Sequence, residues 1–206
     1  MPNGLIHEKD EMAIQELTKT LKETFKNNLA RNSKISATTS RGKTAQFAAN
    51  KATDNDLNSY WATNDEEKTA SLTLDFEKLT SFNRFLVQEP IQLGQRVKSF
   101  SLEAFINGKW TEIAKETTIG YKRILRFATV KATKLRLNIL DSKSCPLISN
   151  IEVYKAPIVL TPPTIIRDKE GLVSFQSGDK ESEIYYTLDG SQPNSNSAKY
   201  APPVKT

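Results

Sequence analysis

The sequence predicts a mainly β protein: an antiparallel sandwich or barrel, with one helix before it and a small β-unit after it. The first observation is a change of period. Apolar residues recur every three or four positions in residues 10–25, and every second position after about residue 35. The second is the regular recurrence of turn residues, such as Gly94 and Asn107-Gly108, between the alternating runs. Many short strands at such spacing are typical of an antiparallel sandwich.

Residues 10–25 predict one amphipathic helix. Its apolar positions lie three and four residues apart and form a single stripe, made of Ile14, Leu17, Leu21 and Phe25. Asp10 is expected to cap the N-terminus. An apolar stripe must pack against something, and the sequence leaves two partners open: the β-domain that follows, or a domain that is absent from this chain.

The alternating runs mark the strands of the β-domain. Every second residue is apolar and its neighbours are polar, as expected for a strand with one buried and one solvated face. The clearest runs are residues 71–76, 100–106, 135–139 and 151–153. Asn107-Gly108 is a two-residue hairpin signal, so we expect a tight turn between the strands on either side of it.

The last segment predicts a linker and a second β-unit. Residues 155–163 are rich in proline and indicate a stiff, extended linker. Residues 172–175 and 184–188 predict two strands, and Asp189-Gly190 predicts a turn. About 45 residues is marginal for an independent core, so we expect this unit to be truncated.

Composition excludes several classes of function. The single cysteine, Cys145, excludes an intrachain disulfide and a cysteine-based zinc site. His7 is the single histidine, which leaves a nucleophilic triad little to work with. Two carboxylates could still hydrolyse a glycosidic bond. No local pattern marks such a pair, and the acidic residues are interpreted as solvated.

The net charge of +5 does not indicate a nucleic-acid binder, because the basic residues alternate along predicted strands and a solvated sheet face explains them. No apolar run approaches the roughly 20 residues that a bilayer requires, so membrane insertion is not expected. The first residues lack the basic-then-apolar layout of a signal peptide. If this chain is part of a longer, exported protein, we expect the export signal to lie upstream of residue 1.

The segment at residues 50–61 carries oxygen-bearing side chains at spacings of two or three. Such a loop could wrap a hard cation such as Ca²⁺. It could equally be an Asx-rich turn without a metal, because Asp and Asn form such turns unaided. Spacing alone leaves both interpretations open.

The same segment resembles the discoidin, or coagulation factor 5/8 C-type, domain, whose fold is shared with family 32 carbohydrate-binding modules. The resemblance implies a galactose-binding-like β-sandwich in which Trp61 anchors the core and a cation lies between this loop and the closing strand, residues 149–154. By position, the ligands would be the carbonyls of Lys51 and Asp56, the carboxylate of Asp54, the carbonyl or hydroxyl of Ser59, and Ser149 and Asn150. Asn150 stands where the family has a carboxylate, and Asn55 where it has glycine, so we expect a structural Ca²⁺ site of modest affinity.

Three further segments resemble family 29 glycoside hydrolases, the α-L-fucosidases. Residues 88–100 and 117–123 are similar to segments of that family's C-terminal domain, and residues 3–10 to the last loop and helix of its catalytic barrel. The resemblance implies a parent protein that is a retaining α-L-fucosidase with its catalytic residues upstream of this chain. The chain would then be a non-catalytic accessory region of an exported bacterial enzyme, periplasmic or extracellular.

Residues 184–193 resemble the chitobiase/β-hexosaminidase C-terminal domain, a small immunoglobulin-like accessory unit. The resemblances together divide the chain into three parts. Residues 1–30 would end the catalytic barrel, residues 31–156 would form the discoidin-like sandwich, and residues 157–206 would hold the linker and part of the immunoglobulin-like unit.

Two functions from different classes remain open for the sandwich. It is either a carbohydrate-binding module that holds fucosylated or galactosylated glycans near the catalytic domain, or a structural domain that braces that domain in cis. Related modules place sugar contacts on loops at one end, here residues 62–69, 88–96 and 141–146. The candidate contacts are Asn64, Glu89, Gln92, Gln95, Arg96 and Ser144. These loops hold no aromatic residue on which a sugar ring could stack, which favours bracing slightly.

Overall fold

The computed structural model describes residues 6–157, 163–177, 182–201 and 204–205. The chain divides into two compact units, residues 1–157 and 158–206, and each is described by itself. Most of the predicted linker at residues 155–163 lies outside the described residues.

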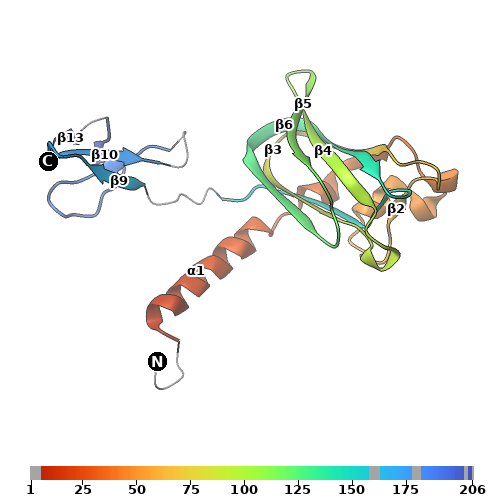
Figure 1. Ribbon diagram of the computed structural model, residues 1–206, viewed down its shortest axis with the longest axis horizontal. Coiled ribbons are helices and arrows are strands. Elements are labelled where there is room, and N and C mark those ends of the chain that lie inside the picture. The colour runs from red at the N-terminus through yellow and green to blue at the C-terminus, as the bar shows by residue number, and fades with distance from the viewer. Residues whose placement is uncertain (1–5, 158–162, 178–181, 202–203, 206) are drawn as a thin grey trace. The chain divides into compact units, whose positions relative to one another are not determined.

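The first unit begins with helix α1, which spans Glu8–Thr24 (Figure 1). The predicted helix is confirmed, but its expected start is wrong. His7 is the N-cap, and its Nδ1 accepts a hydrogen bond from the Lys9 N–H at 3.1 Å, so that Asp10 lies in the first turn. The helix dipole favours an acid in the first turn, although an acid at this position does not cap the helix. Within the described ranges, no helix is long and apolar enough to cross a bilayer.

The apolar stripe of α1 faces solvent. Ile14, Leu17 and Leu21 are 52%, 58% and 48% exposed. Contact with the sandwich is made where the helix ends: the Phe25 ring packs edge-on against Tyr154, with ring centroids 5.1 Å apart. The described part of the chain therefore leaves most of the stripe uncovered.

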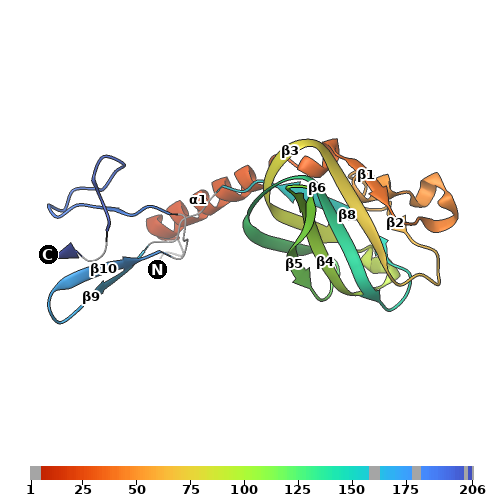
Figure 2. The ribbon, with the colours of Figure 1, turned by 90° about the horizontal axis from the view of Figure 1, so that it is seen from above.

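The body of the first unit is a six-stranded antiparallel sheet (Figures 1 and 2). Its strands are β1 (Lys34–Ala37), β3 (Ala70–Gln88), β4 (Val97–Ile106), β5 (Lys109–Glu116), β6 (Arg123–Ser142) and β8 (Asn150–Tyr154). Their order is β1-β3-β6-β4-β5, and β8 pairs with β3. A second, two-stranded sheet pairs β2 (Trp61–Ala62) with β7 (Leu147–Ile148). The predicted class, a mainly β antiparallel sandwich with an N-terminal helix, is confirmed.

The long strand β3 changes its partners and its register along its length. β3 has 19 residues and pairs with β1 through residues 72–75 and with β8 through residues 84–88. Between these stretches its register against β6 shifts, and Glu77 has a φ of 59°. The irregular stretch interrupts the period-two pattern, which is why the alternating run at residues 71–76 predicts only the first part of the strand.

Large apolar side chains fill the core on the inner face of this sheet. The fully buried ones include Trp61, Phe82, Phe85, Phe100, Leu102, Leu135, Leu137 and Ile151. The expected anchor role of Trp61 is confirmed: it is 0% exposed, and its indole N–H donates to the Thr39 carbonyl at 2.9 Å. Burying one such side chain stabilises the fold by about 1.5–3 kcal/mol.

Short 3₁₀ helices connect the strands. η2 (Arg41–Lys43), η3 (Ala45–Phe47) and η4 (Ala49–Ala52) follow β1 and gather with β2 at one end of the sandwich (Figures 1 and 2). η1 (Leu29–Asn32) follows α1, and η5 (Ile91–Leu93) follows β3. The predicted hairpin between β4 and β5 is confirmed, with Asn107 and Gly108 at φ 50° and 80°.

The described residues of the second unit form two small sheets. One joins β13 (Val204–Lys205), β10 (Leu172–Gln176) and β9 (Thr164–Arg167), and the other joins β11 (Tyr185–Tyr186) and β12 (Ala198–Lys199). Phe175 packs against Tyr186 and Tyr200, with ring centroids 6.1 and 4.9 Å apart. The strand predicted at residues 184–188 is limited to β11, because Thr187 already belongs to the Asp189-Gly190 turn and bonds to the Ser191 carbonyl.

Candidate functional site

The loops predicted to carry sugar contacts do meet at one end of the sandwich, around Cys145. This side chain is 1% exposed. Its Sγ lies 2.7 Å from Arg96 Nη1 and 3.0 Å from Arg41 Nη2, and Asp65 Oδ1 lies 3.6 Å away. Arg96 also donates to the Cys145 carbonyl at 3.1 Å. Residues 62–69, 88–96 and 141–146 are therefore held together by two guanidinium groups and one thiol.

Arg41 lies outside the three predicted loops, in η2. Its Nε donates to the Thr63 carbonyl at 3.1 Å, and its Nη2 pairs with Asp65. The guanidinium carbon lies 5.5 Å from the centroid of the Phe47 ring. Phe47 in turn packs against Tyr60, with centroids 5.5 Å apart. The loop end thus contains the aromatic pair that the three predicted loops lack.

Asn64 joins the predicted loop at residues 62–69 to η2. Its Oδ1 accepts the Gly42 N–H at 3.1 Å, and its Nδ2 donates to Glu67 Oε1 at 3.0 Å. The Thr39 hydroxyl donates to the same carboxylate oxygen at 3.1 Å. The other carboxylate oxygen, Glu67 Oε2, is buried with no hydrogen-bond partner among the described residues.

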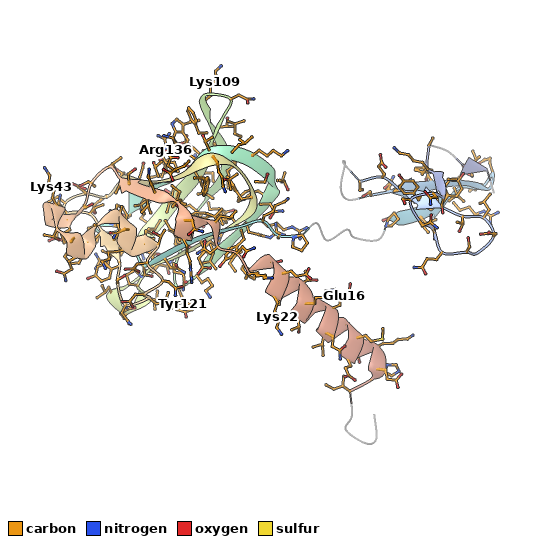
Figure 3. The ribbon with its side chains drawn as sticks, turned by 180° about the vertical axis from the view of Figure 1, so that it is seen from behind. Glu16, Lys22, Lys43, Lys109, Tyr121 and Arg136 are labelled. Atoms are coloured by element: carbon orange, nitrogen blue, oxygen red, sulfur yellow. The ribbon has the colours of Figure 1, made fainter. Side chains whose placement is uncertain are left out.

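A groove runs along this connection. It has a volume of about 750 Å³ and is lined by Ala37, Thr38, Thr39, Ser40, Gly42, Lys43, Thr44, Ala45, Ala48 and Asn64. Four hydroxyl groups, one amide and one ammonium group line it, together with three alanines and Gly42. Gly42 and Lys43 both have positive φ, 57° and 53°. A positive φ is uncommon for lysine, and such a backbone persists only where the surroundings hold it. Figure 3 shows Lys43 projecting from this end of the sandwich.

Glu89 has a different role from the one expected. It is 2% exposed. Its Oε1 accepts the N–H groups of Arg96 and Val97 at 2.7 and 2.9 Å, and its Oε2 accepts the Gly120 N–H at 2.7 Å. Both carboxylate oxygens are committed to the backbone, which corrects the expectation that Glu89 offers acceptors to a sugar. It fixes the loop on which Arg96 sits.

The remaining candidates on these loops are spread out. Gln92 lies in η5. Gln95 lies next to Gly120, because a Cβ atom added to this glycine would be 3.8 Å from the Gln95 side-chain amide. Both are exposed. Ser144 lies next to the thiol, with its Oγ 3.8 Å from Cys145 Sγ. The structure therefore brings Asn64, Arg96 and Ser144 to one place and leaves Gln92 and Gln95 at its margin.

The predicted cation loop forms a compact group of oxygen atoms. Ser59 Oγ lies 2.8 and 2.7 Å from the two oxygens of Asp54, 3.1 Å from the Asp56 carbonyl and 3.3 Å from the Lys51 carbonyl. Asp54 Oδ1 also accepts the Asp56 N–H at 3.0 Å. Asn55 has a φ of 68°, which explains why asparagine can replace glycine there. An all-oxygen set of two carbonyls, a carboxylate and a hydroxyl is the chemistry that Ca²⁺ prefers.

The pKa of Asp54 reflects competing effects. Burial acts to raise it, but hydrogen bonds from the Asp56 N–H and the Ser59 hydroxyl, with the Lys51 ammonium group, lower it, and the net shift is downward. Lys51 Nζ lies 3.2 Å from Asp54 Oδ2. The carboxylate is therefore ionised at neutral pH and is paired with the Lys51 ammonium group.

Ser149 and Asn150 make their hydrogen bonds with β3 and β8. The Ser149 N–H donates to the Gln88 carbonyl at 2.9 Å. Asn150 Nδ2 donates to Gln88 Oε1 at 2.9 Å and to Glu152 Oε1 at 3.0 Å. Across the described ranges, no three His, Cys, Asp or Glu side chains gather as metal ligands, so a cation at this loop would depend on carbonyl oxygens.

Comparisons with known proteins identify the family to which the chain belongs. Residues 34–152 match the F5/8 type C domain, and residues 173–206 match the Fn3-associated family. The chain is 35% identical to alpha-L-fucosidase 1 of Arabidopsis thaliana over 156 residues, which is 74% of this chain and 31% of that protein. It therefore spans about a third of the length of this relative.

Solved structures agree. The Ruminococcus gnavus GH29 fucosidase in complex with fucose superimposes with a TM-score of 0.69 and 29% identity, covering 75% of this chain and 32% of that one. Chitosan-binding module 1 from the chitosanase/glucanase of Paenibacillus sp. IK-5 superimposes with a TM-score of 0.56 and 19% identity, covering 62% of this chain and 98% of the module, which shows a shared fold. The chain belongs to the F5/8 type C domain family, and with its Fn3-associated segment it resembles the C-terminal region of family 29 α-L-fucosidases.

Proposed function

We propose that the chain is a non-catalytic accessory region of an α-L-fucosidase and that the loop end of its sandwich binds glycans. The observation that supports this most is the hydroxyl-lined groove, whose lining includes Ala45 and Ala48 on either side of Phe47 in the chain, and Phe47 packs against Tyr60. Sugar hydroxyls need several fixed donors and acceptors, and the apolar face of a sugar ring needs an aromatic or aliphatic surface. The loop end offers both.

The groove residues would divide these tasks. Lys43 would contact sugar hydroxyls. Asn64, bonded to Gly42 and Glu67, and Thr39, bonded to Glu67, would hold the groove wall in position. Arg41 and Arg96 would support the loops without contacting sugar, because their guanidinium groups are already engaged by Cys145 and the loop carbonyls. Fucosylated or galactosylated glycans are the proposed ligands, held near a catalytic domain in cis.

The proposed cofactor is one structural Ca²⁺ ion. The carbonyls of Lys51 and Asp56, the Asp54 carboxylate and the Ser59 hydroxyl would hold it. When bound, it would supply positive charge that locks this loop. The segment leads directly into Trp61, so an ordered loop supports both the core and the groove.

A glycan array tests the binding. With Ca²⁺ present, the wild-type chain should bind a defined set of oligosaccharides, and free sugar should compete. Asn64→Ala removes the hydrogen bonds that position Gly42 and Glu67 and should weaken binding about tenfold, the equivalent of about 1.4 kcal/mol. Lys131→Gln, an exposed change on β6 at the position opposite Ser81, is the control and should bind as wild type does. Silence from a folded sample across the array would reject glycan binding.

A second candidate function is bracing of the catalytic domain, and the exposed stripe of α1 favours it. Three large apolar side chains on one helix face are stabilised when another domain covers them. In this alternative, the sandwich would hold the catalytic domain in place without binding sugar. The two functions use different surfaces and can coexist.

A further inference from the structure

Two arginines lie side by side on neighbouring strands of the six-stranded sheet. Arg84 on β3 and Arg126 on β6 are direct partners in the antiparallel register. The neighbouring pair, Phe85 and Leu125, is buried, so the arginines lie on the opposite, outer face. Like charges directly opposite each other destabilise a sheet. This pair therefore costs stability in the chain as it stands.

Several other basic residues of the same sheet are neutralised by a carboxylate, although Lys131 on β6 has no ion pair among the described residues. These ion pairs are Arg136 with Glu103, Lys134 with Asp75, Lys98 with Asp141 and Arg123 with Glu116. Neither Arg84 nor Arg126 forms an ion pair with a carboxylate among the described residues. Arg84 Nη1 donates instead to the Asn83 carbonyl at 2.8 Å. Partial burial, and then the charge of Arg126, lower the pKa of Arg84.

The arginine pair is continuous with the attachment point of α1. Tyr154 on β8 lies opposite Arg84 on its other side, and Tyr154 is the residue that Phe25 packs against. Ile124, two residues from Arg126 on the same face, is 46% exposed. An exposed apolar stripe and an uncompensated cationic pair thus lie on either side of the Phe25–Tyr154 contact.

We propose that Arg84 and Arg126 form the charged part of a docking surface for a carboxylate-bearing face of the catalytic domain in cis, the same body that covers the stripe of α1. The inference rests on the proposed function, in its bracing form. The chain spans about a third of the relative's length, so a large partner domain is expected in a fucosidase-length protein. Carboxylates are the side chains that pair bidentately with guanidinium groups, and one acidic residue between the two arginines would turn repulsion into attraction.

The test is a change of sign. Melting temperatures are measured for this chain and for the fucosidase-length protein that carries it, each as wild type, Arg126→Gln and Lys131→Gln. In this chain alone, Arg126→Gln should raise the melting temperature by roughly 1–3 °C at low salt, because repulsion is relieved. The gain should shrink at 0.5 M NaCl. In the fucosidase-length protein, the same substitution should lower the melting temperature of the sandwich, because a buried partner carboxylate loses its counterion. Lys131→Gln, which removes the same charge from the same strand, should change neither protein by more than about 1 °C.

A stabilising effect of Arg126→Gln in both proteins overturns the proposal. Leu17→Glu in the fucosidase-length protein separates the two levels of the argument. If Leu17→Glu destabilises it and Arg126→Gln does not, the docking role of the arginines is refuted and bracing stands. If neither destabilises it, bracing fails as well. If Arg126→Gln stabilises both proteins and also abolishes binding of a sulfated oligosaccharide to this chain, the occupant is an anionic glycan and the interface is refuted.

Discussion

Asp54 and Glu89 are both carboxylates in loops, and their surroundings give them opposite roles. Glu89 accepts three backbone N–H groups, so its charge is consumed in fixing the loop next to Arg96. Asp54 keeps an exposed edge and lies among other oxygen atoms, where a cation would relieve the crowding. Sequence spacing identified the oxygen-rich loop around Asp54. It could not reveal the role of Glu89, because the partners of that carboxylate are backbone N–H groups, which leave no side-chain pattern in the sequence.

Calcium should therefore stabilise the chain through Asp54. For a dissociation constant of about 0.1–1 mM, 10 mM CaCl₂ should add about 1.4–2.7 kcal/mol to the free energy of unfolding. Asp54→Asn should abolish the gain, whereas Asp189→Asn, at an Asx turn in the second unit, should leave it intact. Thermal unfolding with EDTA and with CaCl₂ measures both. Equal melting temperatures for wild type under the two conditions would reject the ion.

The same carboxylate has a pH dependence of known sign. Its folded-state pKa is lowered from 3.8, so its contribution is complete above the unfolded-state value and is lost as the pH falls through the lowered one. Between pH 5 and 8 this group should leave stability unchanged. Calcium protection should therefore be flat across that range.

Helix α1 illustrates how far an element can be predicted. Its stripe was clear from spacing, and the structure confirms the helix. Its start differs from the expected one because the His7 side chain caps the first turn. Spacing left its docking partner open, and the structure shows that contact begins only at its end. Asn28, just beyond, accepts the Val153 N–H at 3.1 Å and ties the chain to β8.

Two truncations make this boundary measurable. Deleting residues 1–22 should lower the free energy of unfolding by less than about 0.5 kcal/mol, because those side chains are largely exposed. Deleting residues 1–28 should cost about 2–4 kcal/mol, since it removes the Phe25–Tyr154 contact and leaves the Val153 N–H without its partner. Urea unfolding of both truncations tests the difference. A large loss from the shorter deletion would mean that α1 docks along the sandwich.

At the scale of the molecule, local signals predicted the fold well and the site only in part. Alternation and the Asn107-Gly108 turn are features of short segments, so sequence reasoning finds them, whereas the Trp61 anchor came from the family resemblance. The loop end is different, because it joins residues far apart in the chain: Arg41 and Cys145 are 104 positions apart. The Phe47–Tyr60 pair was missed because both residues lie outside the three predicted loops. An aromatic residue beside the glycine-containing turn at Gly42 was the available signal, but nothing in the spacing linked it to the other loops.

The claim of a glycan site at the loop end depends on where on the sandwich sugar binds. We would titrate the ¹⁵N-labelled chain with L-fucose and with a galactose-terminated oligosaccharide in the presence of Ca²⁺, and follow the backbone amide resonances. We predict saturable shifts confined to the groove at residues 38–48, with Asn64, and none on the outer sheet face at Arg84 and Arg126. Unchanged spectra at high sugar concentration, or shifts elsewhere on the sandwich, would refute a glycan site at the loop end and leave bracing as the function of this region.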